Sequence, residues 1–264
     1  MKRLSILCCG FIATLFSAAP VMAQQLNATN ETLINAVSML DVPYVANVLE
    51  KNDVEELVLN TDELDCTTFV EYAVAMTLAP VKNNQKDEPV FAEYVQKLRY
   101  RDGKIDGYPS RLHYMTEWAQ NAIKQGLLKD ITAENSEYTM TAQAGFMTAH
   151  SNLYRHLANN SANVQKMREI EQRINGTTVS YVPQDKLPDY GYDWIKDGDI
   201  IMFTTNEPGL DVAHMGIAMN IAGKLTLIHA SSVAKKVTVS KFTISKMLAD
   251  NSKWTGIRVL RIVK

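Results

Sequence analysis

Residues 213–231 read Ala213-His214-Met215-Gly216-Ile217-Ala218-Met219-Asn220-Ile221, then Ala222-Gly223, then Lys224-Leu225-Thr226-Leu227-Ile228-His229-Ala230-Ser231. In the first run Met215, Ile217, Met219 and Ile221 occupy every second position, as in a strand with one core-facing row. The other row starts with His214. Ala222-Gly223 has the length and composition of a two-residue hairpin turn. The stretch therefore predicts a β-hairpin with a histidine on each strand.

The turn fixes which residues of the two strands face each other. With Ile221 opposite Lys224, Gly216 falls opposite His229, and His214 becomes a diagonal neighbour of His229 about 7–8 Å away at the backbone. A slip of one residue would turn His229 to the other face. A lone strand histidine is more often structural than catalytic. Two histidines converging on one face are a better candidate for a site.

The rest of the chain separates into helical patterns followed by strand patterns. Apolar spacing predicts helices over about 30–40, 64–79, 89–102, 111–125 (capped by Ser110) and 141–175, the last broken near 159–160. Period-two patterns predict strands over 178–182, 199–204, 214–221, 224–231, 235–241 and 256–263. This order predicts an α+β fold, with N-terminal helices packed on a C-terminal antiparallel sheet.

A cysteine stands at the predicted start of one of these helices, in Leu64-Asp65-Cys66-Thr67-Thr68-Phe69-Val70-Glu71-Tyr72. Asp62 or Asp65 can cap the helix, which places Cys66 in its first turn. Free backbone N–H groups and the positive end of the helix dipole favour a thiolate there and can hold an oxyanion. The alternative is a small buried apolar residue. We expect a nucleophile, with His214 as its base and His229 orienting His214.

The N-terminus resembles a secretory signal. Lys2 and Arg3 precede an apolar run over residues 4–19, and Ala23 ends a small-residue cleavage pattern. We expect cleavage at that point and a periplasmic or extracellular protein, 24–264. Of the three cysteines only Cys66 would remain, which favours a working thiol outside the cytoplasm.

A lipid anchor at Cys8 or Cys9 is not favoured, because a small residue normally precedes a modified cysteine. No later run is long enough for a membrane span. Losing Lys2 and Arg3 would take the formal charge from −2 to −4. No basic run is left, so nucleic acid is not expected as a partner. We expect a monomer.

The motifs resemble those of the NlpC-type papain-like cell-wall cysteine hydrolases, and more closely their N-acetylmuramoyl-L-alanine amidase-like branch. The stretches that carry the resemblance are Pro43-Tyr44-Val45, 64–71, Ser110-Arg111-Leu112-His113-Tyr114, Gly198-Asp199 and Asp211-Val212-Ala213-His214-Met215-Gly216. They are spread over about 40–264. The resemblance implies a papain-like fold, Cys66 as nucleophile, His214 as base and His229 as third member.

The resemblance further implies that Tyr44 lines the site near the oxyanion, and we assign Asp65 and Thr67 to the substrate pocket. The wider superfamily has Ser-Gly where Thr67-Thr68 stands and a glycine where Asn47 stands, so endopeptidase specificity is not carried over. We expect an amidase that hydrolyses the N-acetylmuramic acid–L-alanine bond of peptidoglycan or muropeptides. The alternatives are a γ-D-glutamyl-diamino acid endopeptidase and a non-catalytic wall-binding domain.

Three further residues are candidates for substrate binding. Arg111 and His113 begin a predicted helix, where a guanidinium and aromatic faces suit a ligand with carboxylates and sugar rings. The alternative is an ordinary charged and aromatic helix surface, which would show the same sequence pattern. Asp211 either caps the loop before His214 or contacts substrate, with the loop role favoured. No metal and no cofactor are expected, because no cluster has ligand spacing. The chain should form a single catalytic domain with a helical insertion at about 80–176.

Overall fold

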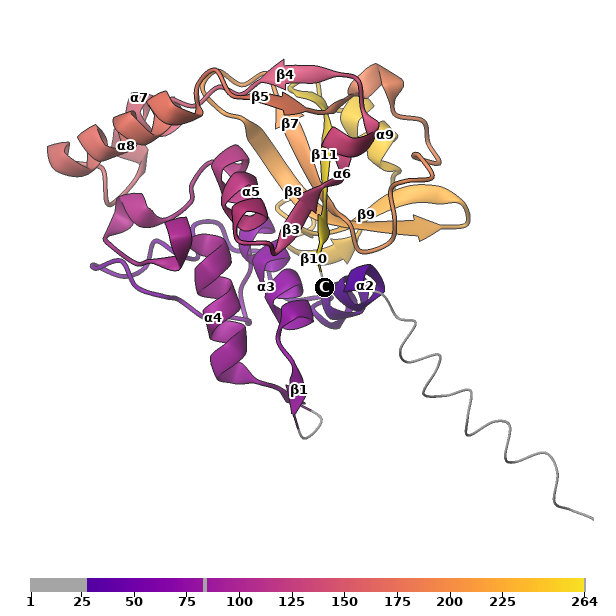
Figure 1. The fold of residues 1–264 in the computed structure, drawn as a ribbon, viewed down its shortest axis with the longest axis horizontal. Helices are drawn as coiled ribbons and strands as arrows, with labels where there is room; N and C mark the ends of the chain where they lie inside the picture. Colours follow the sequence, from indigo (N-terminus) through magenta and orange to yellow (C-terminus); the bar gives the residue numbers. More distant parts are fainter. Residues whose placement is uncertain (1–27, 83–84, 264) are drawn as a thin grey trace, which may run out of the picture.

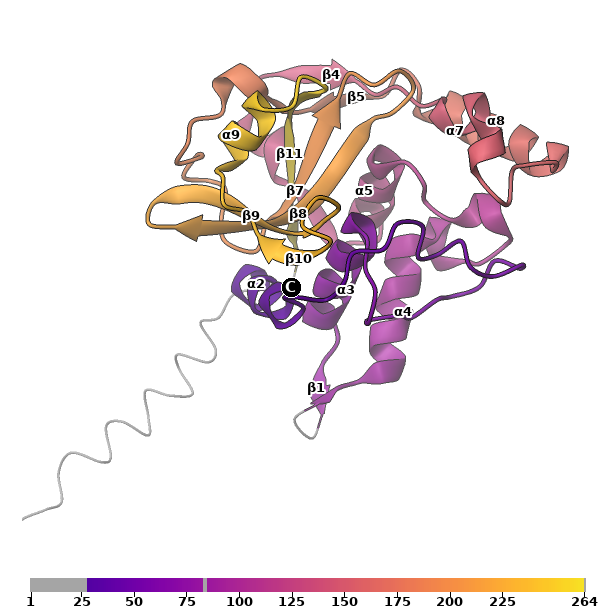
Figure 2. The ribbon, with the colours of Figure 1, turned by 180° about the vertical axis from the view of Figure 1, so that it is seen from behind.

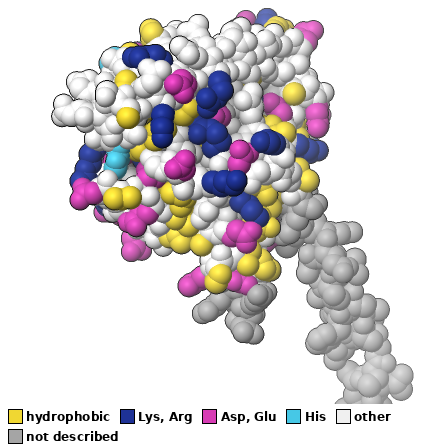
Figure 3. All heavy atoms as spheres, turned by 60° about the vertical axis from the view of Figure 1, so that its left-hand side comes forward, with side chains coloured by type: hydrophobic (Ala, Val, Ile, Leu, Met, Phe, Trp, Pro, Cys, Tyr) yellow, Lys and Arg dark blue, Asp and Glu magenta, His cyan; other side chains and the backbone are white. Residues whose placement is uncertain are grey.

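The computed structural model describes residues 28–82 and 85–263. The predictions for the signal segment 1–23, including Cys8 and Cys9, lie outside these residues. Within the described part, no helix is both long and apolar enough to cross a membrane. On the face shown in Figure 3, Lys and Arg side chains lie among Asp and Glu side chains rather than in a separate basic area.

A seven-stranded antiparallel sheet forms the centre of the molecule, in the order β10-β9-β8-β7-β11-β3, with β6 pairing β11 off this path. Its strands are β3 (Leu128–Asp130), β6 (Val182–Pro183), β7 (Ile200–Thr205), β8 (Val212–Ile221), β9 (Lys224–Ser231), β10 (Lys236–Val239) and β11 (Trp254–Ile262). Two short ribbons pair β1 (Val81–Lys82) with β2 (Gln85–Lys86) and β4 (Thr139–Thr141) with β5 (Thr178–Ser180). The predicted antiparallel sheet in a mixed α and β fold is confirmed.

Helices cover both faces of this sheet (Figures 1 and 2). They are α2 (Ala28–Ser38), α3 (Cys66–Leu78), α4 (Glu88–Arg99), α5 (Met115–Lys124), α6 (Ile131–Asn135), α7 (Phe146–Ala149), α8 (Ser161–Ile174) and α9 (Ile244–Ala249). The first of them, α2, packs on α3, and both contact β8. From the other side, α9 contacts β9 and β11. The early helices α2 and α3 thus pack against one face of the sheet, and α9 packs against the other.

Because both faces are covered, the strand alternation does not separate core from solvent in the way predicted. Met215 and Ile217 pack in the apolar cluster under α3, whereas Ala218 and Leu227 pack in a second cluster under α9. The predicted core row ends early, since Ile221 is 42% exposed at the hairpin tip. The sheet is a shared wall between two apolar layers.

The predicted hairpin register is confirmed. Ile221 pairs with Lys224 and Ile217 with Ile228. A Cβ added at Gly216 would stand 2.7 Å from the Ile228 carbonyl oxygen and 3.0 Å from Cβ of His229. Glycine is therefore required there by the close approach of β9, and the space it leaves is used by the neighbouring strand.

Three predicted segments differ from the structure in whole or in part. The helix expected from Arg111 begins only at Met115, because Arg111 forms a bridge with Tyr100 and Ser110 belongs to a 3-10 turn. In the long helix expected over 141–175, the predicted break near 159–160 is present, because Asn160 caps α8, but the part before the break is only the short helix α7 and a 3-10 turn. The helical α9 replaces an expected loop.

The segment expected as a helical insertion, 80–176, is not purely helical. It contains β3, which pairs with β11 in the main sheet, and β4, which pairs with β5. Part of the segment, including Met167 and Ile170 of α8, forms a third apolar cluster of its own. That the chain is one domain stays a prediction.

Candidate active site

The thiol of Cys66 stands at the first residue of α3 because Asp65 caps the helix. Oδ1 of Asp65 accepts a hydrogen bond from the Thr68 backbone N–H at 2.8 Å, and the Thr68 hydroxyl oxygen accepts one from the Asp65 N–H at 2.9 Å. This reciprocal capping box fixes where the helix begins. Of the two predicted caps, Asp65 rather than Asp62 fills the role, and its carboxylate is held by the cap.

The two hairpin histidines contact each other directly. Nε2 of His214 and Nδ1 of His229 are 2.6 Å apart, and the rings meet edge to face with centroids 4.9 Å apart. Nδ1 of His214 makes no hydrogen bond within the described residues. If Nε2–H of His214 donates to His229, Nδ1 is left with a free lone pair. This is the tautomer that a general base requires, and its orientation follows from the hairpin register.

Two aromatic rings lie next to the imidazole of His214. The Trp254 ring lies nearly parallel to it, at 4° and 5.8 Å between centroids, and the Phe203 ring lies 5.7 Å away. Two register shifts produce this arrangement. The β7–β8 pairing skips Ala213, and the β7–β11 pairing skips Thr255. Such bulges re-aim side chains at the ends of strands.

A cavity of about 560 Å³ brings these groups together; we call it the thiol cavity, and it is lined by Tyr44, Cys66, His214, His229 and Trp254 among others. The predicted nucleophile, base and third member thus open into one space. Tyr44 belongs there as expected, because its backbone N–H donates to the Lys235 carbonyl and ties it beside β10. No hydrogen bond joins the thiol to an imidazole among the described residues.

The expectation that the helix start makes Cys66 acidic is wrong for the free protein. Burial raises the pKa of the Cys66 thiol to about 12, and the neighbouring charge of Asp65 adds to the rise. Hydrogen bonds from the Met215 backbone and the Thr67 side chain to the sulfur lower the pKa but do not offset burial. The resting thiol is therefore protonated, and Thr67 acts on the sulfur.

The imidazoles are neutral for the same reason. Burial lowers the pKa of His214 to about 3, with the adjacent His229 contributing, and burial lowers the pKa of His229 to about 4. Burial also raises the pKa of Tyr44; the charge that Cys66 would carry as a thiolate and the charge of Asp65 raise it further, so the phenol stays a hydrogen-bond donor. The cavity holds a neutral thiol, a neutral base and a protonated phenol.

Two predicted substrate residues, Arg111 and His113, do not line the thiol cavity. Arg111 is buried, and its Nη2 lies 2.7 Å from Glu50 and 3.2 Å from Glu55. His113 hydrogen-bonds the Tyr108 carbonyl, and its pKa is lowered well below the usual value by burial, then by the Arg111 charge. Arg111 is held inside the fold by partners distant in sequence, and His113 by a carbonyl five residues earlier.

Asp211 takes the loop role. Its carboxylate is buried and accepts hydrogen bonds from the N–H of Thr116 at 2.6 Å and of Val212 at 2.9 Å. The first of these satisfies a free N–H at the start of α5. Burial raises the pKa of Asp211, while the hydrogen bonds lower it. Asp211 therefore joins α5 to the beginning of β8, two residues ahead of Ala213, and does not line the thiol cavity.

Trp254 is a residue of the thiol cavity that the sequence analysis did not indicate. It stands at the start of β11, 40 residues after His214 along the chain, in Lys253-Trp254-Thr255-Gly256. Only the pairing of β11 with β7 brings it beside β8. A tryptophan at the start of a strand, followed by Gly256 at a bulge, is a weak signal that could have marked it.

Together the fold and the cavity define a class: α+β proteins with a central antiparallel sheet, in which a cysteine at a helix start and two hydrogen-bonded histidines line one cavity. The family follows from comparison. Residues 36–257 match the AmiA-like family, described as N-acetylmuramoyl-L-alanine amidase-like, and the chain belongs to this family.

Solved structures agree with that membership. An N-acetylmuramoyl-L-alanine amidase from Bacteroides uniformis is 55% identical, with a TM-score of 0.87, over 89% of this chain and 99% of that one. A Bacteroides fragilis protein that carries a provisional xylanase name is 52% identical, with a TM-score of 0.85, over 87% and 99%. Protein LPG0564 from Legionella pneumophila, 20% identical with a TM-score of 0.66 over 96% and 95%, shares the fold. No curated protein matches the chain.

Proposed function

We propose that this protein is a cysteine amidase that hydrolyses the amide bond between N-acetylmuramic acid and L-alanine in peptidoglycan or its soluble fragments. The observation that carries the proposal is the thiol cavity, where Cys66 opens into the same space as the His214–His229 pair. Family membership and the relative named as an amidase support the bond. The thiol helix packed on an antiparallel sheet supports a papain-like arrangement.

In this mechanism proton transfer and nucleophilic attack occur together, because neither the thiol nor the imidazole is charged beforehand. Sγ of Cys66 attacks the amide carbonyl carbon as its proton passes to Nδ1 of His214. Charge develops on the carbonyl oxygen, where the Cys66 backbone N–H at the helix start and the Tyr44 hydroxyl can donate. His229 stabilises the imidazolium by accepting from Nε2–H of His214.

The tetrahedral intermediate then breaks its carbon–nitrogen bond. His214 gives its proton to the amine of the departing L-alanine, leaving a thioester on Cys66. A water molecule loses a proton to His214 and attacks the thioester carbonyl. The carbon–sulfur bond breaks, the thiol regains its proton, and the lactyl group of the sugar leaves as a carboxylic acid.

The xylanase name of the Bacteroides fragilis relative implies a different chemistry. Most glycoside hydrolases need a pair of carboxyl groups flanking the scissile bond. No aspartate or glutamate lines the thiol cavity in the described part of the chain. The cavity therefore favours amide hydrolysis through the thiol over glycoside hydrolysis.

The proposal is tested by digesting muropeptides and intact sacculi with the purified protein and identifying the products by mass spectrometry. A free disaccharide together with an intact stem peptide is expected. A cut within the stem peptide would instead establish the endopeptidase alternative. No product from either substrate would favour a wall-binding domain. Cys66→Ala should remove turnover while leaving the thermal unfolding temperature unchanged, and retained turnover would overturn the thiol mechanism.

Export is part of the proposal, because Lys2, Arg3, the apolar run over 4–19 and Ala23 together have the pattern of a cleaved signal. Expression of the full chain in a bacterial host, with fractionation and N-terminal sequencing of the product, tests it. Mature protein beginning at Gln24 outside the cytoplasm is the expected result. Full-length protein retained in the cytoplasm would contradict export.

A further inference from the structure

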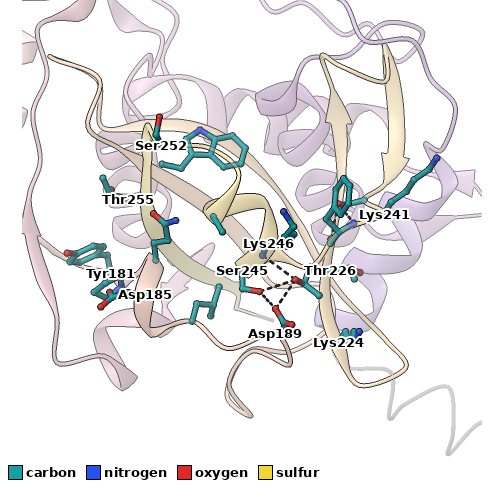
Figure 4. A pocket seen from close by; sticks show the side chains of 18 of the residues that line it. Tyr181, Asp185, Asp189, Lys224, Thr226, Lys241, Ser245, Lys246, Ser252 and Thr255 are labelled. Carbon is teal, nitrogen blue, oxygen red and sulfur yellow. Dashed lines mark hydrogen bonds between the residues drawn. The ribbon is translucent and has the colours of Figure 1, made fainter.

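The thiol cavity has a larger neighbour on the same side of the sheet as α9. This groove, which we call the α9 groove, has a volume of about 1210 Å³ and is lined by Tyr181, Asp189, Lys224, Thr226, Ser245 and Lys246 among others (Figure 4). Four residues line both spaces: Ser240, Lys241, Phe242 and Trp254. The thiol cavity and the α9 groove are therefore adjacent, and they meet at residues 240–242 and Trp254.

Lys241 stands at this junction and is the one charged residue, among those described, that lines the thiol cavity. Its side chain is exposed and forms no ion pair with any described residue. Figure 4 shows Lys241 pointing away from Asp189 and Ser245, which hydrogen-bond each other. Its charge is therefore available to a ligand, in a cavity that contains no carboxylate to neutralise it.

The backbone that carries Lys241 is fixed on both sides. The Ser240 N–H donates to the Leu227 carbonyl at 2.7 Å, and its hydroxyl bridges to the backbone of Phe242. Immediately afterwards Thr243 caps α9, and its hydroxyl donates to Asp189 at 3.1 Å. Only the side chain of Lys241 retains freedom, so little order has to be imposed on the segment when a ligand binds.

We propose that Lys241 binds a carboxylate on the peptide half of the substrate, which passes from the thiol cavity into the α9 groove. The inference rests on the proposed function. In the substrate the lactyl carboxyl group of the sugar is consumed in the scissile amide, so the sugar half is uncharged. The stem peptide retains free carboxylates. A lone cation that lines the thiol cavity therefore discriminates the peptide half from the glycan half.

Two further lysines, Lys224 and Lys246, line the α9 groove, and a described carboxylate acts on each. Lys246 pairs with Asp250 and lies over the Phe242 ring, so its charge is already used. Lys224, beside the hairpin turn, forms no salt bridge with a described residue, but its charge acts on Asp189, a carboxylate that lines the same groove. Lys241 is therefore the lysine at the junction whose charge no described carboxylate offsets.

The test compares two N-acetylmuramoyl dipeptides, one with free carboxylates and one with both carboxylates amidated. Wild-type protein should prefer the acidic substrate by about five- to tenfold in KM, with similar kcat, and added salt should weaken the preference. Lys241→Met should bring the two substrates to equal KM. Lys166→Met, which removes an exposed lysine of α8 far from both cavities, should leave the preference intact.

Binding to an inactive protein separates this inference from the proposed function. Calorimetry with Cys66→Ala should show binding of the acidic peptide product, and the added Lys241→Met change should weaken it about five- to tenfold. Binding without hydrolysis in the wild type would leave Lys241 as a peptide-binding residue and overturn only the amidase. Equal use of both substrates by wild type, or affinity that depends on the number of sugars instead, would overturn the role of Lys241.

Discussion

The indole of Trp254 lies parallel to the imidazole of His214, with 4° between the planes and 5.8 Å between the ring centroids. The two residues come from strands that do not pair with each other. Both strands pair with β7, where His214 lies opposite Phe203 and Trp254 lies opposite Thr205, two positions further along, with a register shift beside each. The indole shields one face of the imidazole from water and so contributes to the burial that keeps His214 neutral.

Truncating this indole should move the pH dependence. Trp254→Ala admits water to His214, which raises its pKa from about 3 towards the ordinary value. The base works only when neutral, so activity falls as the pH drops through its pKa, and the acid limb of kcat/KM should shift to higher pH. Trp254→Phe keeps a ring in place and should shift less. An acid limb identical in all three proteins would contradict the shielding role.

His229, the third member of the proposed triad, should tolerate replacement by asparagine but not by leucine. Oδ1 of an asparagine can stand near the position of Nδ1 in His229, where it can still accept from Nε2–H of His214. His229→Asn should therefore retain kcat within about tenfold, whereas His229→Leu should lower kcat roughly 100-fold or more because the tautomer is no longer fixed. Steady-state kinetics distinguishes the two. Equal losses would mean that His229 acts through packing alone.

The rate of Cys66 alkylation should depend on pH in the way expected of a thiol that is protonated at rest. With a thiol pKa of about 12, the rate with iodoacetamide should rise about tenfold per pH unit from pH 7 to pH 10, without a plateau near neutrality. A plateau near neutral pH would instead indicate a preformed thiolate–imidazolium pair.

Asp65→Asn provides the matched variant for that measurement. Asparagine caps helices about as well as aspartate, so α3 should still begin at Cys66. Removing the Asp65 charge lowers the thiol pKa, since that charge raises it, and alkylation at a given pH should accelerate about threefold. An unchanged rate with an unchanged unfolding temperature would show that Asp65 does not act on the thiol electrostatically.

Arg111 should contribute to the stability of the fold and not to substrate binding. Arg111→Met leaves Glu50 and Glu55 without their shared cation, and the free energy of unfolding should fall by about 3 kcal/mol. Urea unfolding measures this loss, and KM below the transition should stay at the wild-type value. A raised KM in a protein of unchanged stability would restore the substrate-binding role expected from the sequence.

The parts of the site that could be predicted are those set by local rules. The turn at Ala222-Gly223 has both residues at positive φ, 50° and 76°, so two residues determine the register of the hairpin and the meeting of His214 with His229. The start of α3 follows from its own capping sequence. Each of these needs only a few neighbouring residues.

The parts that could not be predicted depend on distant partners. Arg111 is neutralised by a segment about 60 residues earlier, and its charge pattern alone suggests an exposed helix surface. β3 is three residues long, too short for a period to be seen, and it forms because β11 offers an edge. The thiol pKa depends on burial, which the position of Cys66 in its helix does not reveal.

The strand order has a consequence for when the active site can exist. β11 follows every other strand along the chain, yet it lies inside the sheet between β7 and β3. It also supplies the ring beside His214. Until β11 inserts, β7 has an open edge and the base lacks its shield, however well α3 and the β8–β9 hairpin have formed. Catalytic competence should therefore be among the last properties acquired in folding, so partly folded chains remain inactive.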